Sequence, residues 1–579
     1  MGSSNPGSVL SLGSNVIVRD GTWICEWLLL TANMSYGFDL ESISLSPSTR
    51  AVVPTSSLLG NTFSFPLVAS IAPTVFTPGA TYAFRLIISS ASSLFAVYDD
   101  VSVIVNIPPS QGSLRVHPPS GYGLLTTFQL SAVDWQSTSG GYPLSYRFSY
   151  QVTRQYYSNY ISAANSTAPT ILSLLPTGTR ALNYLISLQV MVADAVGASS
   201  SANQTVKVLP DPLSDTASLV SIIAGSSDQY LTDIVISTLN SNSSLLTSTG
   251  GYCTADDQCV SNACINSYCG SSNISEAQCP TSSVAAECSG HGRCQFTDGV
   301  GRHQANCSVG NSFCVAICAC DSGHAGAGCE FTAQQFLEQD QVRSAACKAI
   351  NAQTYNENSF PLLANSYQVG AVSESTTMTC FQALTKISEN TTSNTDYQAW
   401  AQSISSFTEY LRISMSRSNY TPMSNYSITG ENVSMILDAF TASVTRAEFD
   451  GMATSYITSA FTIVLEKLPL FEFSNATFVS GQSSITLPAS GLQTCGASAS
   501  SRILAVAQWN INPYFNSSAL VTPLLRLTVG ERSGGAQIRH PASGDTFFLQ
   551  LPFISPQDII PQISFPNNYT IPVCRKKIL

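Results

Sequence analysis

Alternating apolar and polar positions dominate the first 107 residues of the chain. Apolar side chains occupy every second position in two runs: Tyr82, Phe84, Leu86 and Ile88, then Val101, Val103 and Val105. A period of two is typical of strands with one buried face. The pattern stops at Pro108-Pro109, where proline lacks the amide hydrogen that a sheet needs. We therefore expect residues 1–107 to form one β-sandwich.

Residues 108–212 show the same alternation of apolar and polar positions. Two further runs alternate: Phe128, Leu130 and Ala132, then Leu144, Tyr146, Phe148 and Tyr150. Gly140-Gly141 lies between the two runs and predicts a turn, so that they form a hairpin with one aromatic face. Two consecutive blocks of about 100 residues with short strands indicate two β-sandwiches of the Ig/fibronectin type.

The next segments change character. Residues 213–250 are Ser-rich, with a weak helical pattern from Leu219 to Ile236, and we interpret them as a connector. Residues 251–330 are rich in cysteine and poor in apolar side chains, so disulfides must replace a core there.

Helical spacing begins after this cysteine-rich segment. Over residues 331–465 the spaced apolar side chains are Tyr397, Trp400, Ile404, Phe407 and Leu411, then Val433, Ile436, Phe440 and Val444. Thr332 and Gln335 fit a capping box at the start of this region. Residues 466–579 return to β character, with Phe547, Leu549 and Leu551 alternating. We expect a helical subdomain followed by another β-sandwich.

Composition argues against disorder and against nucleic-acid binding. The chain is 44% hydrophobic and 10% charged, with a net charge of −11, whereas disordered chains combine low hydrophobicity with high net charge. No basic stripe with interleaved aromatic side chains occurs. No run reaches the ~18 apolar residues of a membrane helix. Met1–Ser4 does not resemble a signal peptide, and the chain stops soon after Cys574, so we expect further sequence at both ends of the gene product.

Cysteine usage indicates an oxidising compartment. Twelve of the 17 cysteines lie between Cys253 and Cys329, which predicts a disulfide framework of an extracellular protein. Asn-x-Ser/Thr glycosylation sites support an exterior location. They begin at Asn33, Asn165, Asn203, Asn242, Asn273, Asn306, Asn390, Asn419, Asn425, Asn432, Asn475, Asn516 and Asn568.

The first four clustered cysteines are Cys253, Cys259, Cys264 and Cys269. Four cysteines permit three pairings, and we favour Cys253–Cys264 with Cys259–Cys269. Outside the cluster, Cys347 and Cys380 lie on neighbouring predicted helices, and we expect them to pair. Cys25, Cys495 and Cys574 have no assigned partner.

The second part of the cluster resembles an EGF-like module. It contains Cys288-Ser-Gly-His-Gly-Arg-Cys294 and ends in Cys318-Ala-Cys320-Asp-Ser-Gly-His-Ala-Gly-Ala-Gly-Cys329, with Gly323 and Gly326 at the family's glycine positions. The resemblance implies three pairings: Cys279–Cys294, Cys288–Cys318 and Cys320–Cys329. Cys307 and Cys314 lie in an insertion and are expected to pair with each other.

Metal binding is the competing interpretation of this segment. His291, His303 and His324 lie within the cluster, and dense Cys/His spacing can ligate zinc. The oxidising context favours disulfides and solvated histidines. Of the four residues directly before Cys279, only Glu276 is acidic, so calcium is not expected either, and no cofactor is predicted.

The flanking regions resemble polycystin-1-like proteins. Gly121-x-x-Leu124-x-Thr126-x-Phe128, Trp135 and Pro143-Leu144-x-Tyr146-x-Phe148 are similar to the REJ (receptor for egg jelly) region of that family. The segment Trp509-Asn-Ile-Asn-Pro-Tyr514 resembles a strand of the family's GAIN domain. The family's cleavage triplet does not follow, so self-cleavage is not expected. The EGF-like insert departs from the vertebrate arrangement.

Catalytic motifs are absent from the sequence. The five histidines are scattered, and no phosphate loop or dinucleotide fingerprint occurs. Asp99-Asp100 and Asp256-Asp257 are carboxylate pairs, and we interpret both as solvated turn residues. Trp135, Trp400 and Trp509 are interpreted as core residues. An enzyme would require a pocket in which titratable groups converge.

The sequence thus predicts a mostly β multidomain chain. The expected parts are two REJ-like β-sandwiches (1–107 and 108–212), a connector (213–250), an EGF-like segment (251–330), and a GAIN-like helical subdomain and β-sandwich (331–465 and 466–579). The resemblance implies a cell-surface protein that binds, tethers or senses force, with a polycystin-type cation channel subunit as partner at a cilium or flagellum. The alternative is a structural glycoprotein of an extracellular filament, such as a flagellar hair, that contacts other filament glycoproteins.

Overall fold

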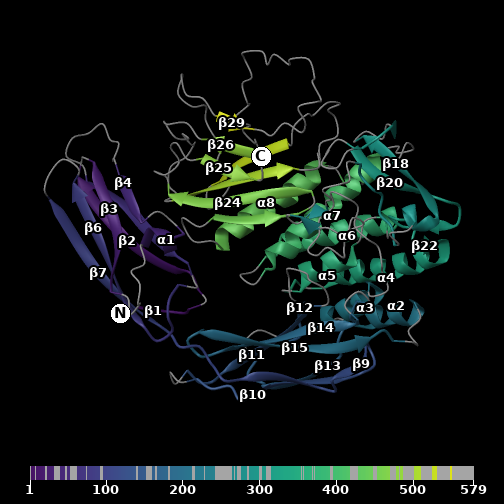
Figure 1. Cartoon of the computed structure of the whole chain (residues 1–579), viewed down its shortest axis with the longest axis horizontal. Helices are drawn as coiled ribbons and strands as arrows, with labels where there is room; N and C mark the ends of the chain where they lie inside the picture. The colour runs from purple at the N-terminus through teal and green to yellow at the C-terminus, as the bar shows by residue number, and fades with distance from the viewer. Residues whose placement is uncertain are drawn as a thin grey trace, which may run out of the picture.

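The computed structural model describes most of residues 2–240 and 276–469 apart from short loops, a hairpin within 264–269, and separate strands between 477 and 550. Its fold is mostly β, with two-sheet β-sandwiches, a disulfide-rich segment and a later group of helices. Figure 1 shows the helices lying between the second sandwich and the last sheet. No helix among the described residues is long and apolar enough to cross a membrane.

The first sandwich packs a larger sheet against a two-stranded one. The larger sheet has the order β1 (Gly2–Ser4), β7 (Ala96–Val105), β6 (Thr81–Ser90), β3 (Trp23–Thr31) and β4 (Thr49–Val52), and the smaller pairs β2 (Leu10–Arg19) with β5 (Thr62–Ile71). A short helix, α1 (Leu40–Ile43), precedes β4. Tyr82, Phe84 and Leu86 are buried in the core, as their alternation predicts.

The second sandwich also has two sheets. One contains β13 (Thr170–Ser173), β10 (Phe128–Val133) and β8 (Ser113–His117), and the other contains β12 (Asn159–Tyr160), β11 (Ser145–Gln151), β14 (Leu185–Ala193), β15 (Ser199–Leu209) and β9 (Ser120–Tyr122). The expected hairpin across Gly140-Gly141 is wrong, because β10 and β11 belong to different sheets. The aromatic face is nevertheless buried between those sheets, with Phe148 and Tyr150 in the core.

Each sandwich closes with a parallel strand pair. β1 pairs with the last strand of the first sandwich, Gly2 opposite Val103, and β9 pairs with the last strand of the second, Tyr122 opposite Leu209. Asn5 lies where the two sandwiches meet: its amide nitrogen donates to the Val196 carbonyl, and its amide oxygen accepts from Asn106 at 2.7 Å.

The segment 213–250, expected as a connector, is partly a packed element. It contains α2 (Thr216–Gly225) and α3 (Gln229–Asn240). Leu219, Ile223 and Val235 are buried in one core with the later helices. The weak helical pattern in the sequence arises because α3 is buried on several sides, which removes the polar face that makes a surface helix easy to recognise.

The helical module follows the disulfide-rich segment. Its helices are α4 (Ala333–Ala352), α5 (Ser359–Ser366), α6 (Glu374–Ser388), α7 (Tyr397–Ser416) and α8 (Gly430–Ala447). The capping box at Thr332 and Gln335 is present at the start of α4. Trp400 is fully buried and stacks on Phe360 with ring centroids 4.6 Å apart, so its interpretation as a core residue is confirmed.

Two sheets follow the helices, and the larger one shares their core. The larger has the order β23 (Ala453–Ile457), β24 (Phe461–Pro469), β27 (Ser501–Trp509) and β28 (Leu524–Gly530), and the smaller has β25 (Thr477–Ser480), β26 (Ser483–Thr486) and β29 (Phe548–Gln550). Phe461, Ile463 and Ala507 belong to the same apolar cluster as Trp400 and Phe440. The Trp509 side chain lies outside the described residues.

Candidate functional site

The cysteine-rich segment folds as a small three-stranded sheet with short flanking turns. Its elements are the 3-10 helix η3 (Glu287–Gly290) and the strands β18 (Gly292–Asp298), β19 (His303–Gln304), β20 (Cys314–Cys320), β21 (His324–Ala325) and β22 (Phe331–Thr332). The disulfides Cys279–Cys294, Cys288–Cys318 and Cys320–Cys329 span Cα–Cα distances of 5.7, 5.7 and 5.3 Å. These are the pairs that the EGF-like resemblance implies.

Other cysteines are placed less completely. Cys347 and Cys380 form a disulfide between α4 and α6, and Cys307 is disulfide-bonded. Cys264 and Cys269 are opposite residues of the hairpin β16 (Cys264–Ile265) and β17 (Tyr268–Cys269). Cys25 is buried in the first sandwich. The side chains of Cys264, Cys269 and Cys314, and Cys253, Cys259, Cys495 and Cys574 altogether, lie outside the described residues.

The terminal turn of this module explains its glycines. Gly323 and Gly326 have φ angles of +90° and +112°, a region in which a Cβ is strained. A Cβ on Gly326 would also lie 2.3 Å from the Glu330 carboxylate, which accepts the Gly328 amide. Gly370, between α5 and α6, contacts the same turn: a Cβ there would lie 2.9 Å from the Ala327 backbone. The turn therefore docks closely on the helical module.

The zinc interpretation is not supported at the described sulfur atoms. The sulfurs of Cys279, Cys288 and Cys318 lie within 4.8 Å of one another, but each belongs to a disulfide and offers no thiolate. His291 and His324 stack with centroids 3.9 Å apart. These contacts are those of a packed disulfide module.

Four of the predicted glycosylation sites fall within the described residues. Asn203, Asn306 and Asn390 are exposed, and Asn432 is partly exposed on α8 with Ser434 of the same site buried. The other sites lie outside the described residues: Asn33, Asn165, Asn242, Asn273, Asn419, Asn425, Asn475, Asn516 and Asn568.

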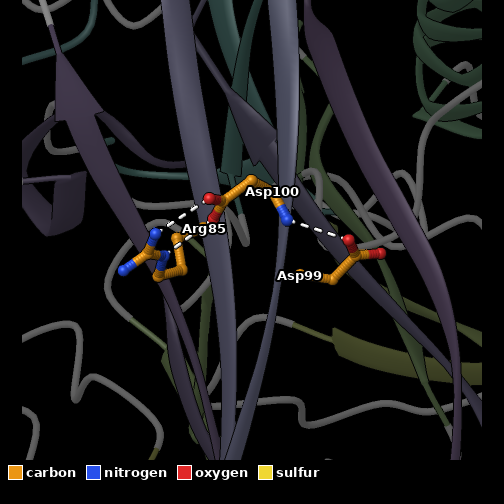
Figure 2. A network of polar contacts seen from close by, with 3 residues as sticks. All are labelled: Arg85, Asp99 and Asp100. Atoms are coloured by element: carbon orange, nitrogen blue, oxygen red, sulfur yellow. Dashed lines mark hydrogen bonds and ion pairs between the residues drawn. The ribbon is translucent and has the colours of Figure 1, made fainter.

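The carboxylate pair Asp99-Asp100 lies in strand β7 and not in the expected turn. Figure 2 shows Arg85 of the neighbouring strand making a bidentate ion pair with Asp100, at 2.7 and 2.8 Å. The hydrogen bond from Arg85 lowers the pKa of the Asp100 carboxyl. The Arg85 guanidinium also lies 4.1 Å from the centre of the Tyr98 ring. No local pattern indicates this cation, because pairing of β6 with β7 brings Arg85 opposite Asp100.

Asp99 has a different role at the edge of the sheet. The Val105 amide donates to Ala80, towards β6, and alternation in an antiparallel ladder then directs the Asp100 amide away from β6. Within the described residues β1 covers only Val103–Val105 of this edge. The Asp99 carboxylate accepts the Asp100 amide at 2.9 Å (Figure 2). Asp99 thus accepts the Asp100 N–H, a backbone donor that a strand of another chain could otherwise pair with. This contact protects the sheet edge against strand addition. Asp256-Asp257 lies outside the described residues.

A buried polar cluster joins the second sandwich to the helices. We call it the junction network, and it consists of Tyr150, Tyr230, Asp233, Arg343 and Asn365. The Asp233 carboxylate on α3 accepts from the Tyr150 hydroxyl of β11 and from the Asn365 amide of α5, the latter at 3.0 Å. Asp233 is 2% exposed. One side chain therefore connects a strand of the sandwich with two helices.

Arg343 forms the second half of the junction network. Its guanidinium donates to the carbonyls of Asn365 and Ser366 at the end of α5, and to the Asn240 amide oxygen at the end of α3. Cations are favourable at helix C-termini because carbonyl groups are unpaired there. Burial lowers the pKa of Arg343 to about 10, so the side chain stays charged at neutral pH.

Further hydrogen bonds surround the junction network. Tyr230 donates to the Leu174 carbonyl at 2.6 Å. Tyr160 of β12 and Asn358 exchange two hydrogen bonds, at 2.9 and 3.1 Å. Polar networks in a dry interface fix its geometry when their members are satisfied. No sequence motif marks this cluster, because its members are far apart in the chain.

Comparison with known families identifies the first part of the chain. A family model for the REJ domain matches residues 6–244. Residues 6–244 are similar to a REJ domain. The match agrees with the resemblance seen in the sequence, and it includes both sandwiches together with α2 and α3. The region that matches the REJ model therefore contributes Tyr150 and Asp233 to the junction network, and the helical module contributes Arg343 and Asn365.

Solved structures give only distant similarity. Domains A168–A170 of titin are 14% identical with a TM-score of 0.16, and domains FN1–FN3 of chicken CNTN1 are 9% identical with a TM-score of 0.17. Each match covers 36% of this chain, which spans 61% and 65% of the two fragments. A search of curated proteins found no match.

Proposed function

We propose that this chain is the non-catalytic, load-bearing extracellular region of a polycystin-1-like cell-surface glycoprotein. The REJ domain supports the polycystin-like context, and the disulfides support an oxidising exterior. The EGF-like and GAIN-like resemblances fit the same assignment. A polycystin-type cation channel subunit is the proposed partner, at a cilium or flagellum.

The parallel strand pairs carry the mechanical part of this proposal. In each sandwich an early strand is parallel to the last strand: β1 to β7 in the first sandwich and β9 to β15 in the second. Tension applied to the two ends of a sandwich pulls such strands in opposite directions along their axes. The evenly spaced hydrogen bonds of a parallel ladder are then loaded together, which raises the barrier to forced unfolding.

Single-molecule force spectroscopy of the whole chain tests this role with a matched pair of variants. The Asn106 amide donates to the Ser4 carbonyl of β1 at 2.8 Å. Asn106→Pro removes that donor, whereas Asn106→Ala keeps it, and both lose the side-chain contact with Asn5. We expect the first sandwich to unfold at lower force in Asn106→Pro than in Asn106→Ala. Equal unfolding forces would contradict a load-bearing strand pair.

The exterior location has its own test. Non-reducing peptide mapping with glycopeptide analysis of protein isolated from its cell measures disulfides and glycans together. We expect oxidised Cys347–Cys380 and glycans at exposed sites such as Asn203. A free-thiol count near the 17 cysteines of the chain would refute an extracellular location.

A further inference from the structure

The junction network has a carboxylate at its centre that is shared by two modules. Asp233 belongs to helix α3 of the REJ domain, and its two oxygens take hydrogen bonds from opposite sides. Tyr150 donates from the sandwich, and Asn365 donates from the helical module. Separation of the sandwich from the helices would expose this carboxylate to water.

Within the part of the chain that the structure describes, no cationic side chain pairs with the Asp233 carboxylate. On α3 and the turn before it, the titratable neighbours are Tyr230 and Asp228, and on the sandwich the neighbour is Tyr150. Helices α2 (Thr216–Gly225) and α5 (Ser359–Ser366) contain no charged residue. The Arg343 guanidinium of α4 donates to Asn240, Asn365 and Ser366. An ionised Asp233 is therefore held only by neutral donors in a dry interface.

Burial shifts the titration of the Asp233 carboxyl toward the protonated form, relative to an aspartate in water. It raises the pKa of the Asp233 carboxyl to about 6, although the hydrogen bonds from Tyr150 and Asn365 act in the opposite direction. Burial also raises the pKa values of Tyr150 and Tyr230, so both phenols remain neutral donors at any physiological pH. Both phenols thus stay neutral while Asp233 titrates.

We propose that mild acid tightens the junction between the REJ sandwich and the helical module, because a proton from solvent binds the buried Asp233 carboxylate. The only covalent change is the new O–H bond on the carboxyl group. The docked state binds this proton more strongly than the open state, in which the carboxyl is solvated. Stability of the junction is therefore gained as the pH falls through about 6 and is complete only below the pKa of a free aspartate, near 4. The inference does not depend on the mechanical role proposed above.

The size of the effect follows from the two pKa values. With about 6 in the docked state and about 3.9 in the open state, acidification from pH 7.4 to pH 5 favours docking by about tenfold. Above pH 7 the carboxyl is ionised in both states, so the equilibrium should become independent of pH.

Hydrogen exchange of the full chain at several pH values, corrected for intrinsic exchange rates, tests the proposal. Amides of β11, α3 and α5 should gain about tenfold protection between pH 7.4 and pH 5, while amides of β2 and β5 in the first sandwich provide an internal reference. Asp233→Asn should abolish this pH dependence, and Asp228→Asn, at an exposed position, should preserve it. A flat wild-type profile would overturn the proposal, as would an unchanged slope in Asp233→Asn.

A second variant keeps the test decisive if Asp233→Asn does not fold. Tyr150→Phe removes a hydrogen bond that lowers the pKa of Asp233. The midpoint of the pH-dependent protection in α5 should then move to higher pH. A midpoint that stays in place or moves to lower pH would show that another group titrates, and would also overturn the proposal.

Discussion

The disulfide between Cys347 and Cys380 allows a quantitative prediction. It joins α4 and α6, its residues are separated by 33 positions, and both cysteines are fully buried in the helical core. Replacing both by alanine releases a chain segment that contains α5 and its neighbouring loops. The loss of stability should therefore be felt in the whole helical module.

The magnitude follows from the entropy of the closed loop. For a separation of 33, the chain-entropy relation gives a stabilisation of about 3.7 kcal/mol at 25 °C. For Cys320–Cys329, with a separation of 9, the same relation gives about 2.6 kcal/mol. The matched double-alanine variant at Cys320 and Cys329 is thus the control, and it should lose about 1 kcal/mol less.

Native-state hydrogen exchange measures each loss locally, which avoids treating a multidomain chain as two-state. Amides of α4 and α6 should lose roughly 500-fold protection in Cys347→Ala/Cys380→Ala, the equivalent of about 3.7 kcal/mol. Amides of β21 and β22, which lie next to Cys320–Cys329 in the chain, measure the loss of protection in the control variant. A loss below about 1 kcal/mol in the helical module, or a larger loss in the control, would refute the loop-entropy reasoning.

Three further substitutions test particular contacts. Arg343→Met should destabilise the helical module by about 3 kcal/mol in native-state hydrogen exchange of α4 and α5, because it leaves acceptors at two helix ends unpaired. Gly370→Ala should cost about 1–3 kcal/mol and expose the turn at Ala327 to hydrogen exchange, whereas Gly225→Ala, with no atom within 4 Å, should not. Asp99→Ala should strengthen self-association about fivefold in analytical ultracentrifugation, since one backbone donor worth about 1 kcal/mol becomes available to a second chain; an unchanged sedimentation profile would contradict edge protection.

Local patterns in the sequence predicted much of the fold. The alternation at Tyr82, Phe84 and Leu86 marks a strand whose one face is buried. The capping box at Thr332 and Gln335 sets the start of α4. These predictions succeeded because strand pleat, helix period and caps are decided by residues close together in the chain.

Pairings across strands and modules were decided by the tertiary structure. Asp99-Asp100 suggested a solvated turn, yet strand pairing brings Arg85 to Asp100. The Gly140-Gly141 turn suggested a hairpin, yet the chain crosses to the other sheet.

Local sequence patterns predicted several strands of the two sandwiches, the helical period after residue 331 and the cysteine framework of the module between them. The tertiary structure alone decided that α2 and α3 pack into the helical core. It alone also placed Asp233 between Tyr150 and Asn365, which lie 83 and 132 positions away in the chain. The physical reason is that burial and hydrogen bonding depend on which surfaces meet, and separations of this length leave no periodic trace in the sequence.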